Sequence, residues 1–186
     1  MKQSIYITAF ILCWIIFLPQ VKSQEIYQTK NGDMIITTVS TNDTIFKVIT
    51  KKLFVLLNYE NAEFEMKMDK SDFLTNNDSL NKQLALMKFE IITFKGKLDI
   101  DKINTNGHSP LDFNVEGMLS TNNKIIKGTG RLEHISNRST FSCLLTLKFN
   151  LKKDELGLNM GDFASYLKED IQIDIIQIVL NKAKNQ

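Results

Sequence analysis

Alternation of apolar and polar residues constrains the fold of this 186-residue chain more than any other feature. It is clearest in residues 62–68, 111–119 and 141–151, where nearly every second residue is apolar. Side chains of a strand point to opposite faces with a period of two, so each stretch predicts a strand with one buried face. Shorter runs rich in β-branched or aromatic residues predict further strands at 34–39, 45–49, 53–57, 89–94, 97–103, 124–135 and 171–180.

Turn-forming residues separate these runs and indicate how the strands connect. Segments 31–33, 41–43, 58–61, 104–110 and 120–123 are rich in Asn, Asp, Gly and Ser, which tolerate or enforce turn geometry. Strands joined by short turns, without regular strand–helix alternation, are typical of antiparallel sheets. About eight such strands must cover or close their edges, so we expect a mainly β chain folded as a sandwich or an up-and-down barrel.

Two short helices are expected to interrupt the strands. Asn77 or Asp78 can cap a helix that runs to about residue 87, with leucines at helical spacing on one face. A second helix is expected at residues 162–168. Residues 171–180 fit either a helix or a strand, and their five isoleucines and one valine favour a strand.

The first 23 residues have the features of a secretory signal peptide, with a basic start, a largely apolar run over residues 5–18 and a small residue at position 23. The apolar run is short for a spanning helix, which needs about 20 residues, so an uncleaved membrane anchor is the less favoured alternative. We therefore predict cleavage between Ser23 and Gln24, and export to a periplasm or to the medium. An N-terminal arm at residues 24–33 and one domain over residues 34–186 would remain.

Removal of this segment changes the charge and the cysteine content. Lys2 and Lys22 leave with it, so 21 basic residues face 21 acidic ones. A net charge this small argues against a nucleic-acid binder, which would normally show a concentrated basic patch, so no such partner is expected. Cys13 is also lost, which leaves Cys143 without an internal disulfide partner. The apolar neighbours of Cys143 favour a buried core thiol over a reactive one.

Residues typical of catalysis or of metal binding are sparse. The two histidines, His108 and His134, are too far apart for the close ligand spacing of a zinc site. Gly128-x-Gly130 lacks the third glycine and the strand-to-helix setting of a phosphate loop, and it predicts a bend or bulge in a strand. The sequence contains no Gly-x-Ser-x-Gly motif. We therefore predict no catalytic site, no metal site and no required cofactor. A hydrolase would need a Ser and a His to meet in a pocket.

Residues from about 34 to 182 resemble the YceI-like family through an ordered series of short segments. The matching segments are residues 62–75 (AEFEMKMDKSDFLT), 78–96 (DSLNKQLALMKFEIITFKG), 113–119 (FNVEGML) and 140–158 (TFSCLLTLKFNLKKDELGL). The chain departs from the family in its helix, where Asn81-Lys82-Gln83 replaces a usual histidine or arginine–aspartate pair. It also lacks the usual proline at residues 90–92, and its turn at residues 120–124 differs.

The resemblance implies a lipocalin-like antiparallel barrel of about eight strands with one or two short helices, which encloses a long isoprenoid chain such as the tail of a quinone. A barrel of that size has room for packed side chains or for one slender ligand. Its inward-facing candidates for contact with a ligand are Phe64, Met66, Phe89, Phe94, Phe113, Phe141 and Phe149.

Two functions remain open at this point. The first is an exported, non-enzymatic binding protein that sequesters or carries an apolar isoprenoid or lipid, for example a quinone. The second is a secreted interaction module with a filled core that acts on another exported protein. A continuous interior tunnel would favour the first, and a filled core the second. No integral membrane span is expected after signal cleavage. The oligomeric state stays open, with a homodimer as one option.

Overall fold

A computed structural model describes residues 25–40, 42–87, 90–104, 109–121, 123–137, 140–156 and 167–183. The strands are β1 (Ile26–Ser40), β2 (Ile45–Asn58), β3 (Glu63–Asp69), β4 (Leu74–Thr75), β5 (Ile91–Leu98), β6 (Leu111–Leu119), β7 (Ile125–Asn137), β8 (Thr140–Lys152) and β9 (Leu167–Lys182). The helices are η1 (Lys70–Asp72), α2 (Asp78–Leu86) and α3 (Lys153–Leu156).

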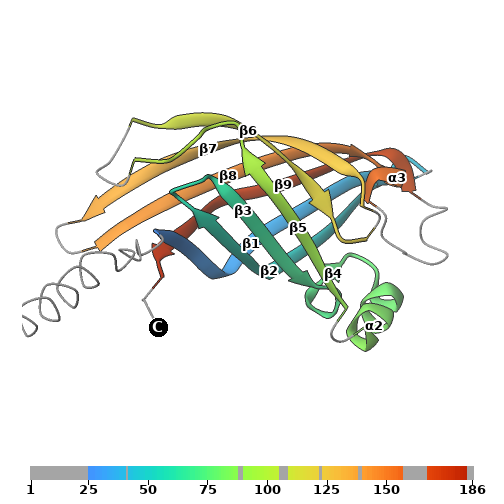
Figure 1. Ribbon diagram of the computed structural model, residues 1–186. Helices are drawn as coiled ribbons and strands as arrows, with labels where there is room; N and C mark the ends of the chain where they lie inside the picture. The colour runs from blue at the N-terminus through green and yellow to red at the C-terminus, as the bar shows by residue number, and fades with distance from the viewer. Residues whose placement is uncertain are drawn as a thin grey trace, which may run out of the picture.

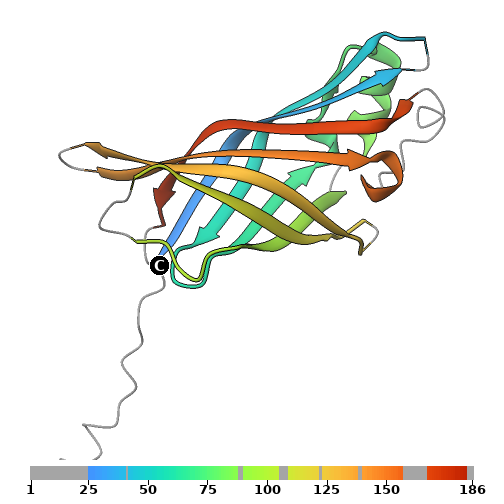
Figure 2. The ribbon, with the colours of Figure 1, turned by 90° about the horizontal axis from the view of Figure 1, so that it is seen from above.

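The strands form a closed antiparallel barrel, which confirms the expected fold class (Figure 1). Strand order around the barrel is β1-β9-β8-β7-β6-β5-β3-β2, and pairing of β1 with β2 closes it. The short strand β4 pairs with β2 beyond the point where β3 leaves it, through Val48↔Thr75 and Ile49↔Leu74. Closure removes the free sheet edges that an open sheet of this length would expose. Figure 2 shows β8 and β9 side by side along the length of the barrel.

Alternation along each strand decides which side chains fill the interior. In β3, Phe64, Met66 and Met68 are buried, and the intervening residues lie on the outer face. In β9, Ile175 is fully buried, whereas its neighbour Ile176 is 56% exposed. Burial of the inward apolar stripes is the main favourable term that holds such a barrel together. The prediction of a strand over residues 171–180 is therefore confirmed.

Several local predictions are corrected by the structure. Residues 26–33 are not an arm, because they form the first half of β1 and pair with β2 and β9. The expected turn at residues 31–33 is an irregularity within β1, where the register shifts on both sides of Gly32. A bulge of this kind absorbs an extra residue without ending the strand. The strands expected separately at residues 89–94 and 97–103 are one strand, β5, which contains Gly96 and ends at Leu98.

The helix predictions have two different outcomes. Asn77 caps α2, and its side chain accepts a hydrogen bond of 3.0 Å from the backbone N–H of Leu80. Leu80 and Leu84 are buried, as their spacing predicts. The helix expected at residues 162–168 lies mostly outside the described residues, and its last two residues belong to β9. The short helix α3 directly follows β8.

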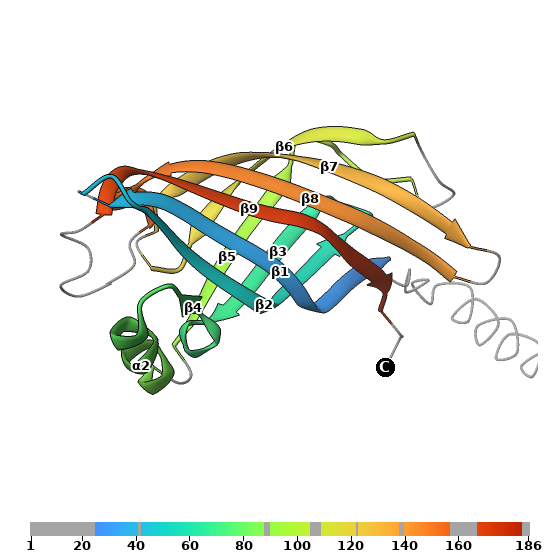
Figure 3. The ribbon, with the colours of Figure 1, turned by 180° about the vertical axis from the view of Figure 1, so that it is seen from behind.

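The two ends of the barrel differ, and they are named here for later use. The helical end carries η1, α2 and α3 together with β4, and there β2, β5, β7 and β9 begin (Figures 1 and 3). The far end carries the start of β1, the end of β9 and the β7–β8 hairpin. The described parts of the predicted turns at 41–43 and 120–123 lie at the helical end, and the turn at 58–61 lies at the far end.

Candidate functional site

The helical end of the barrel encloses a cavity of about 30 Å³. Every residue that lines it is apolar, and together they come from seven strands and from the segments around η1 and α3. The lining residues are Met34, Ile36, Met66, Met68, Phe73, Ile92, Phe94, Leu119, Ile126, Phe149, Leu156 and Ile173. This volume holds only about two water molecules, and an apolar lining of this kind stays dry. The cavity can therefore receive part of an apolar molecule, and it offers no anchor for a charged one.

Three phenylalanine rings form a layer on the inner side of this cavity. The Phe94 ring lies 6.0 Å from the Phe64 ring and 5.6 Å from the Phe149 ring, both in edge-to-face geometry. Edge-to-face pairs at this separation add about 0.5–1.5 kcal/mol beyond the area that they bury. Phe94 and Phe149 also line the cavity, so the layer is the floor on which a ligand in the helical end would rest.

Two glycines of β7 make room for the aromatic rings. A Cβ atom on Gly128 would lie 2.5 Å from Cδ1 of Phe149, and one on Gly130 would lie 2.5 Å from Cζ of Phe113. The β7 register has no shift at either glycine, so the motif is neither a bulge nor a phosphate loop. Glycine at these positions lets a neighbouring ring lie directly over the backbone.

A polar cluster of Tyr27, Tyr59, His134 and Cys143 closes the far end. The Tyr59 ring stacks on Tyr27 with a centroid separation of 4.1 Å. The Tyr59 hydroxyl contacts the Cys143 thiol and lies 3.2 Å from Nε2 of His134. His134 and Cys143 are partners across β7 and β8, which explains why residues distant in sequence meet here.

Burial governs the protonation of this cluster. It raises the pKa of Cys143 to about 11, although the hydrogen bond from Tyr59 partly offsets the effect. Burial also raises the pKa of Tyr27 to about 12 and that of Tyr59 further still. Cys143 is fully buried and remains a thiol at neutral pH, which confirms the core interpretation and argues against a nucleophile.

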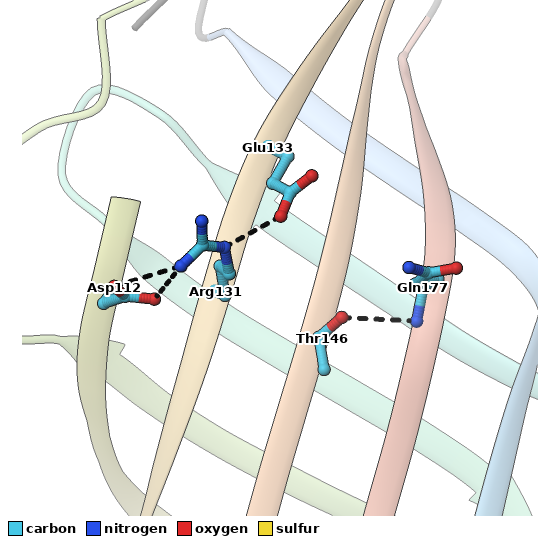
Figure 4. A network of polar contacts seen from close by, with 5 residues as sticks. All are labelled: Asp112, Arg131, Glu133, Thr146 and Gln177. Carbon is cyan, nitrogen blue, oxygen red and sulfur yellow. Dashed lines mark hydrogen bonds and ion pairs between the residues drawn. The ribbon is translucent and has the colours of Figure 1, made fainter. Parts of the chain in front are cut away.

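The outer face of the barrel carries a polar network around Arg131 (Figure 4). The Arg131 guanidinium donates to both carboxylate oxygens of Asp112, at 3.1 and 3.2 Å, and to Glu133 at 2.8 Å. A shallow hollow of about 740 Å³ lies nearby and extends from β5 across β6 and β7 to β8. Its lining includes Lys127 and Glu116, which form an ion pair. Exposed ion pairs of this type contribute about 0–1 kcal/mol and are solvated. Among the described residues, the outer face therefore offers no buried site comparable to the cavity.

The structure places the sequence-predicted candidates in three groups. Met66, Phe94 and Phe149 line the cavity. Phe64 packs against Phe94, and Phe113 is buried over Gly130 without reaching the cavity lining. Phe89, and the side chain of Phe141, lie outside the described residues.

Sequence reasoning missed nine of the twelve lining residues, among them Met34, Met68 and Phe73. Met68 belongs to the same alternating stretch as Met66, so the apolar–polar alternation could have identified it as a lining residue. Phe73 and Leu156 lie outside the long strands, and no periodicity marks them.

Metal binding and membrane spanning find no support in the part of the chain that the structure describes. There, no group of three or more His, Cys, Asp or Glu side chains is arranged to hold a metal ion. Among the same residues, no helix combines the length and the apolar character needed to cross a bilayer.

Comparisons with known proteins find structural likeness without close sequence similarity. No protein-family model and no curated protein sequence matches the chain. A polyisoprenoid-binding domain from Saccharophagus degradans, implicated in plant cell wall breakdown, superposes with a TM-score of 0.64 at 11% identity, over 87% of this chain and 100% of that one. BcnA from Burkholderia cenocepacia superposes with a TM-score of 0.51 at 17% identity, over 81% of this chain and 96% of that one. Both likenesses show a shared barrel fold, and at that level they support the resemblance to YceI-like proteins.

Proposed function

We propose that the protein is an exported, non-enzymatic binding protein that sequesters or carries an apolar isoprenoid or lipid in the helical end of its barrel. The observation that carries this proposal is the cavity lined only by apolar side chains. Such a site would bind through burial of apolar surface, at roughly 25 cal/mol per Å². One structural neighbour is described as a polyisoprenoid-binding domain, which supports an isoprenoid, such as a quinone tail, as the ligand.

Binding requires the cavity to enlarge. Its volume of about 30 Å³ is smaller than any isoprenoid chain, so side chains must move as the ligand enters. Three of the lining residues, Met34, Met66 and Met68, are methionines. Their unbranched thioether side chains adopt many rotamers at low cost and adapt to irregular shapes. We therefore assign to these methionines the conformational adjustment that admits a ligand.

Export is the second component of the proposal. It rests on the basic start, the apolar run of residues 5–18 and the small residue Ser23. Intact-mass measurement of the protein recovered from its host should show a chain that begins at Gln24. A chain that retains residues 1–23 in the membrane fraction would replace this part of the proposal with a membrane anchor.

Native mass spectrometry after gentle purification tests the binding function directly. The protein is offered ubiquinone, geranylgeraniol and palmitate, and bound mass is measured for the wild type and two variants. Ile126→Phe fills the cavity, because Ile126 is 3% exposed and lines it, and should lower uptake at least tenfold. Ile125→Phe is the matched control, because Ile125 is 58% exposed on the opposite face of the same strand. Equal uptake by both variants would move the binding site elsewhere.

A filled-core interaction module is the second candidate, and the small volume of the cavity is the observation that favours it. Its exposed loops or faces would then act on another exported protein. The same experiment separates the two candidates. Absence of any bound lipid in protein from a lipid-rich host, with no uptake of the three added probes, supports the module and removes the carrier.

A further inference from the structure

The exposed large apolar side chains of the described residues gather at the helical end. Ten such residues are exposed, and only Ile135, Ile176 and Val179 lie toward the far end. The other seven lie near strand ends or on the helix at the helical end: Ile45, Ile49, Leu74, Leu86, Ile91, Met118 and Ile125. Single exposed apolar residues are ordinary on soluble proteins, but their concentration beside one end marks an interaction surface.

Four of these side chains belong to one surface built from β2, β4 and α2. The outer face of β2 presents Ile45, Lys47, Ile49 and Lys51 in alternation, all exposed. Leu74 of β4 lies opposite Ile49 in the pairing of the two strands and is 64% exposed. Apolar and basic side chains therefore alternate at spacings of about 7 Å along this face.

Hydrogen bonds join α2 to the same surface. The Asn81 side chain accepts from the backbone N–H of Thr75 at 2.7 Å and donates to its carbonyl at 3.0 Å. The Asn76 side chain donates to the carbonyl of Ile45 at 3.4 Å. α2 contributes Lys82 and Leu86, of which Leu86 is 85% exposed. The docking face is defined as Ile45, Lys47, Ile49, Lys51, Leu74, Lys82 and Leu86.

The docking face carries excess positive charge. Neighbouring lysines outside it are paired, Lys52 with Asp72 at 2.6 Å and Lys70 with Glu90 at 2.7 Å. Within the described residues, no ion pair involves Lys47, Lys51 or Lys82. The acidic residue of α2 is Asp78, which lies in the first turn of the helix. There its negative charge complements the helix dipole.

We propose that the docking face binds the surface of an anionic lipid bilayer. Aliphatic side chains flanked by lysines match such a surface, because the apolar groups enter the interface and the ammonium groups meet lipid phosphates. Protein interfaces differ, since they are enriched in aromatic residues and arginine and depleted in lysine, whereas this face has no aromatic residue and no arginine. This proposal also rests on the proposed function, because docking would bring the end of the barrel that holds the cavity to a source of apolar ligand.

Vesicle flotation with the exported form of the protein tests the proposal. Vesicles of phosphatidylcholine with phosphatidylglycerol are compared with vesicles of phosphatidylcholine alone. Two variants alter the docking face, one by the triple change Ile45→Ser, Leu74→Ser and Leu86→Ser, the other by Lys47→Gln, Lys51→Gln and Lys82→Gln. A matched control alters three exposed residues toward the far end, by Ile135→Ser, Ile176→Ser and Val179→Ser. All six apolar positions are exposed, and far-UV circular dichroism verifies that each variant is folded.

We expect the wild type to float with the anionic vesicles. The serine variant should bind at least tenfold more weakly, and the glutamine variant roughly fivefold more weakly per lysine removed. The far-end control should bind like the wild type. A wild type that stays with the soluble fraction, or a control that loses binding as much as the serine variant, overturns the proposal and points to a protein partner.

Ligand uptake separates this proposal from the function on which it draws. Uptake of geranylgeraniol by native mass spectrometry, in solution without vesicles, should be equal in the wild type and in both docking-face variants. Vesicle binding without uptake would remove the carrier function and keep the docking face. Uptake without vesicle binding would do the reverse.

Discussion

The two ends of the barrel are built from the same alternating strands, yet their interiors are closed in different ways. The far end is filled by large rings and by a hydrogen-bonded cluster around Tyr59, with Leu53, Leu57 and Leu145 fully buried beside it. The helical end is closed by methionines and by residues next to short helices, and it retains a cavity. Outside, the helical end carries most of the exposed apolar side chains.

This difference indicates that the two ends of the barrel have different roles. The far-end network fixes one geometry, because Tyr59 and Cys143 are buried and a broken hydrogen bond would leave a costly unpaired group at either of them. Methionines around a void tolerate several geometries, because their rotamers exchange at little cost. We therefore expect the far end to hold one shape, and the helical end to adapt as the proposed ligand binding requires. The aromatic layer of Phe64, Phe94 and Phe149 lies between them.

Truncation of the far-end cluster should have the largest effect. Tyr59→Ala removes a ring that stacks on Tyr27 and a hydroxyl that contacts Cys143 and His134, so the free energy of unfolding should fall by about 3–5 kcal/mol. Tyr59→Phe keeps the ring and should cost about 1–3 kcal/mol. Urea unfolding followed by far-UV circular dichroism measures both. A loss under about 1 kcal/mol for Tyr59→Ala would show that the far end is not the rigid one.

High pH should destabilise the protein through the far end. The pKa of Cys143 rises from 9.0 to about 11 on folding, so the folded chain keeps a proton that the unfolded chain loses. Its contribution is complete below pH 9 and disappears as the pH rises through 11, at a cost of about 2–3 kcal/mol. Tyr27 adds a further, smaller loss between pH 10 and about 12.

The control for this titration is Cys143→Ala, which removes the thiol and keeps Tyr27 and Tyr59. Urea midpoints measured from pH 8 to about 11 should fall less steeply in the variant than in the wild type. Identical slopes would mean that the thiol is as easily ionised in the folded chain as in the unfolded one, and that the far end admits water.

The sequence predicts the strands well, because the period-two pattern reports directly which side of each strand is buried. It predicts the capped helix α2 for a similar reason, since a cap and helical spacing are local residue patterns. Alternation alone is compatible with a sandwich or a barrel, and the resemblance to the YceI-like family is what implies the barrel that the structure shows. The sequence fails where the same local residues are compatible with two backbone structures. Asn31-Gly32-Asp33 reads as a turn, but pairing with β2 and β9 on both sides converts it into an irregularity inside β1.

The cavity is harder to predict, because its lining depends on contacts between segments far apart in sequence. The phenylalanine and methionine candidates on strands are recognised from alternation, whereas Phe73 and Leu156 take their places only once η1 and α3 pack against the barrel. The far-end cluster is also invisible in the sequence, since Tyr59 lies 75 residues from His134 and 84 from Cys143. Only the closure of the barrel brings them together.

A methyl group added at the boundary between the two ends should have an intermediate effect. Gly128→Ala places a Cβ within 2.5 Å of the Phe149 ring, so it should lower the free energy of unfolding by about 1–3 kcal/mol. Phe149→Leu in the same chain makes room for the methyl group, and the double variant should lose less than the two single losses added together. Strict additivity in a double-mutant cycle would contradict the close contact of β7 with the aromatic layer. Thr129→Ala, an exposed neighbour, serves as the control and should change stability by under about 0.5 kcal/mol.

Substitution of methionines should have the smallest effect on stability and a selective effect on binding. Met66→Leu with Met68→Leu conserves volume, so the free energy of unfolding should change by less than about 1.5 kcal/mol for each residue. Leucine is branched and stiffer than methionine, so the cavity should enlarge less readily and uptake of geranylgeraniol should fall several-fold. Leu147→Met, a change of similar size at a fully packed position outside the cavity lining, is the matched control and should leave uptake unchanged. Equal uptake by all three proteins would mean that the ligand enters without movement of these methionines, and the contrast between a rigid and an adaptable end would then rest on backbone motion instead of side-chain rotamers.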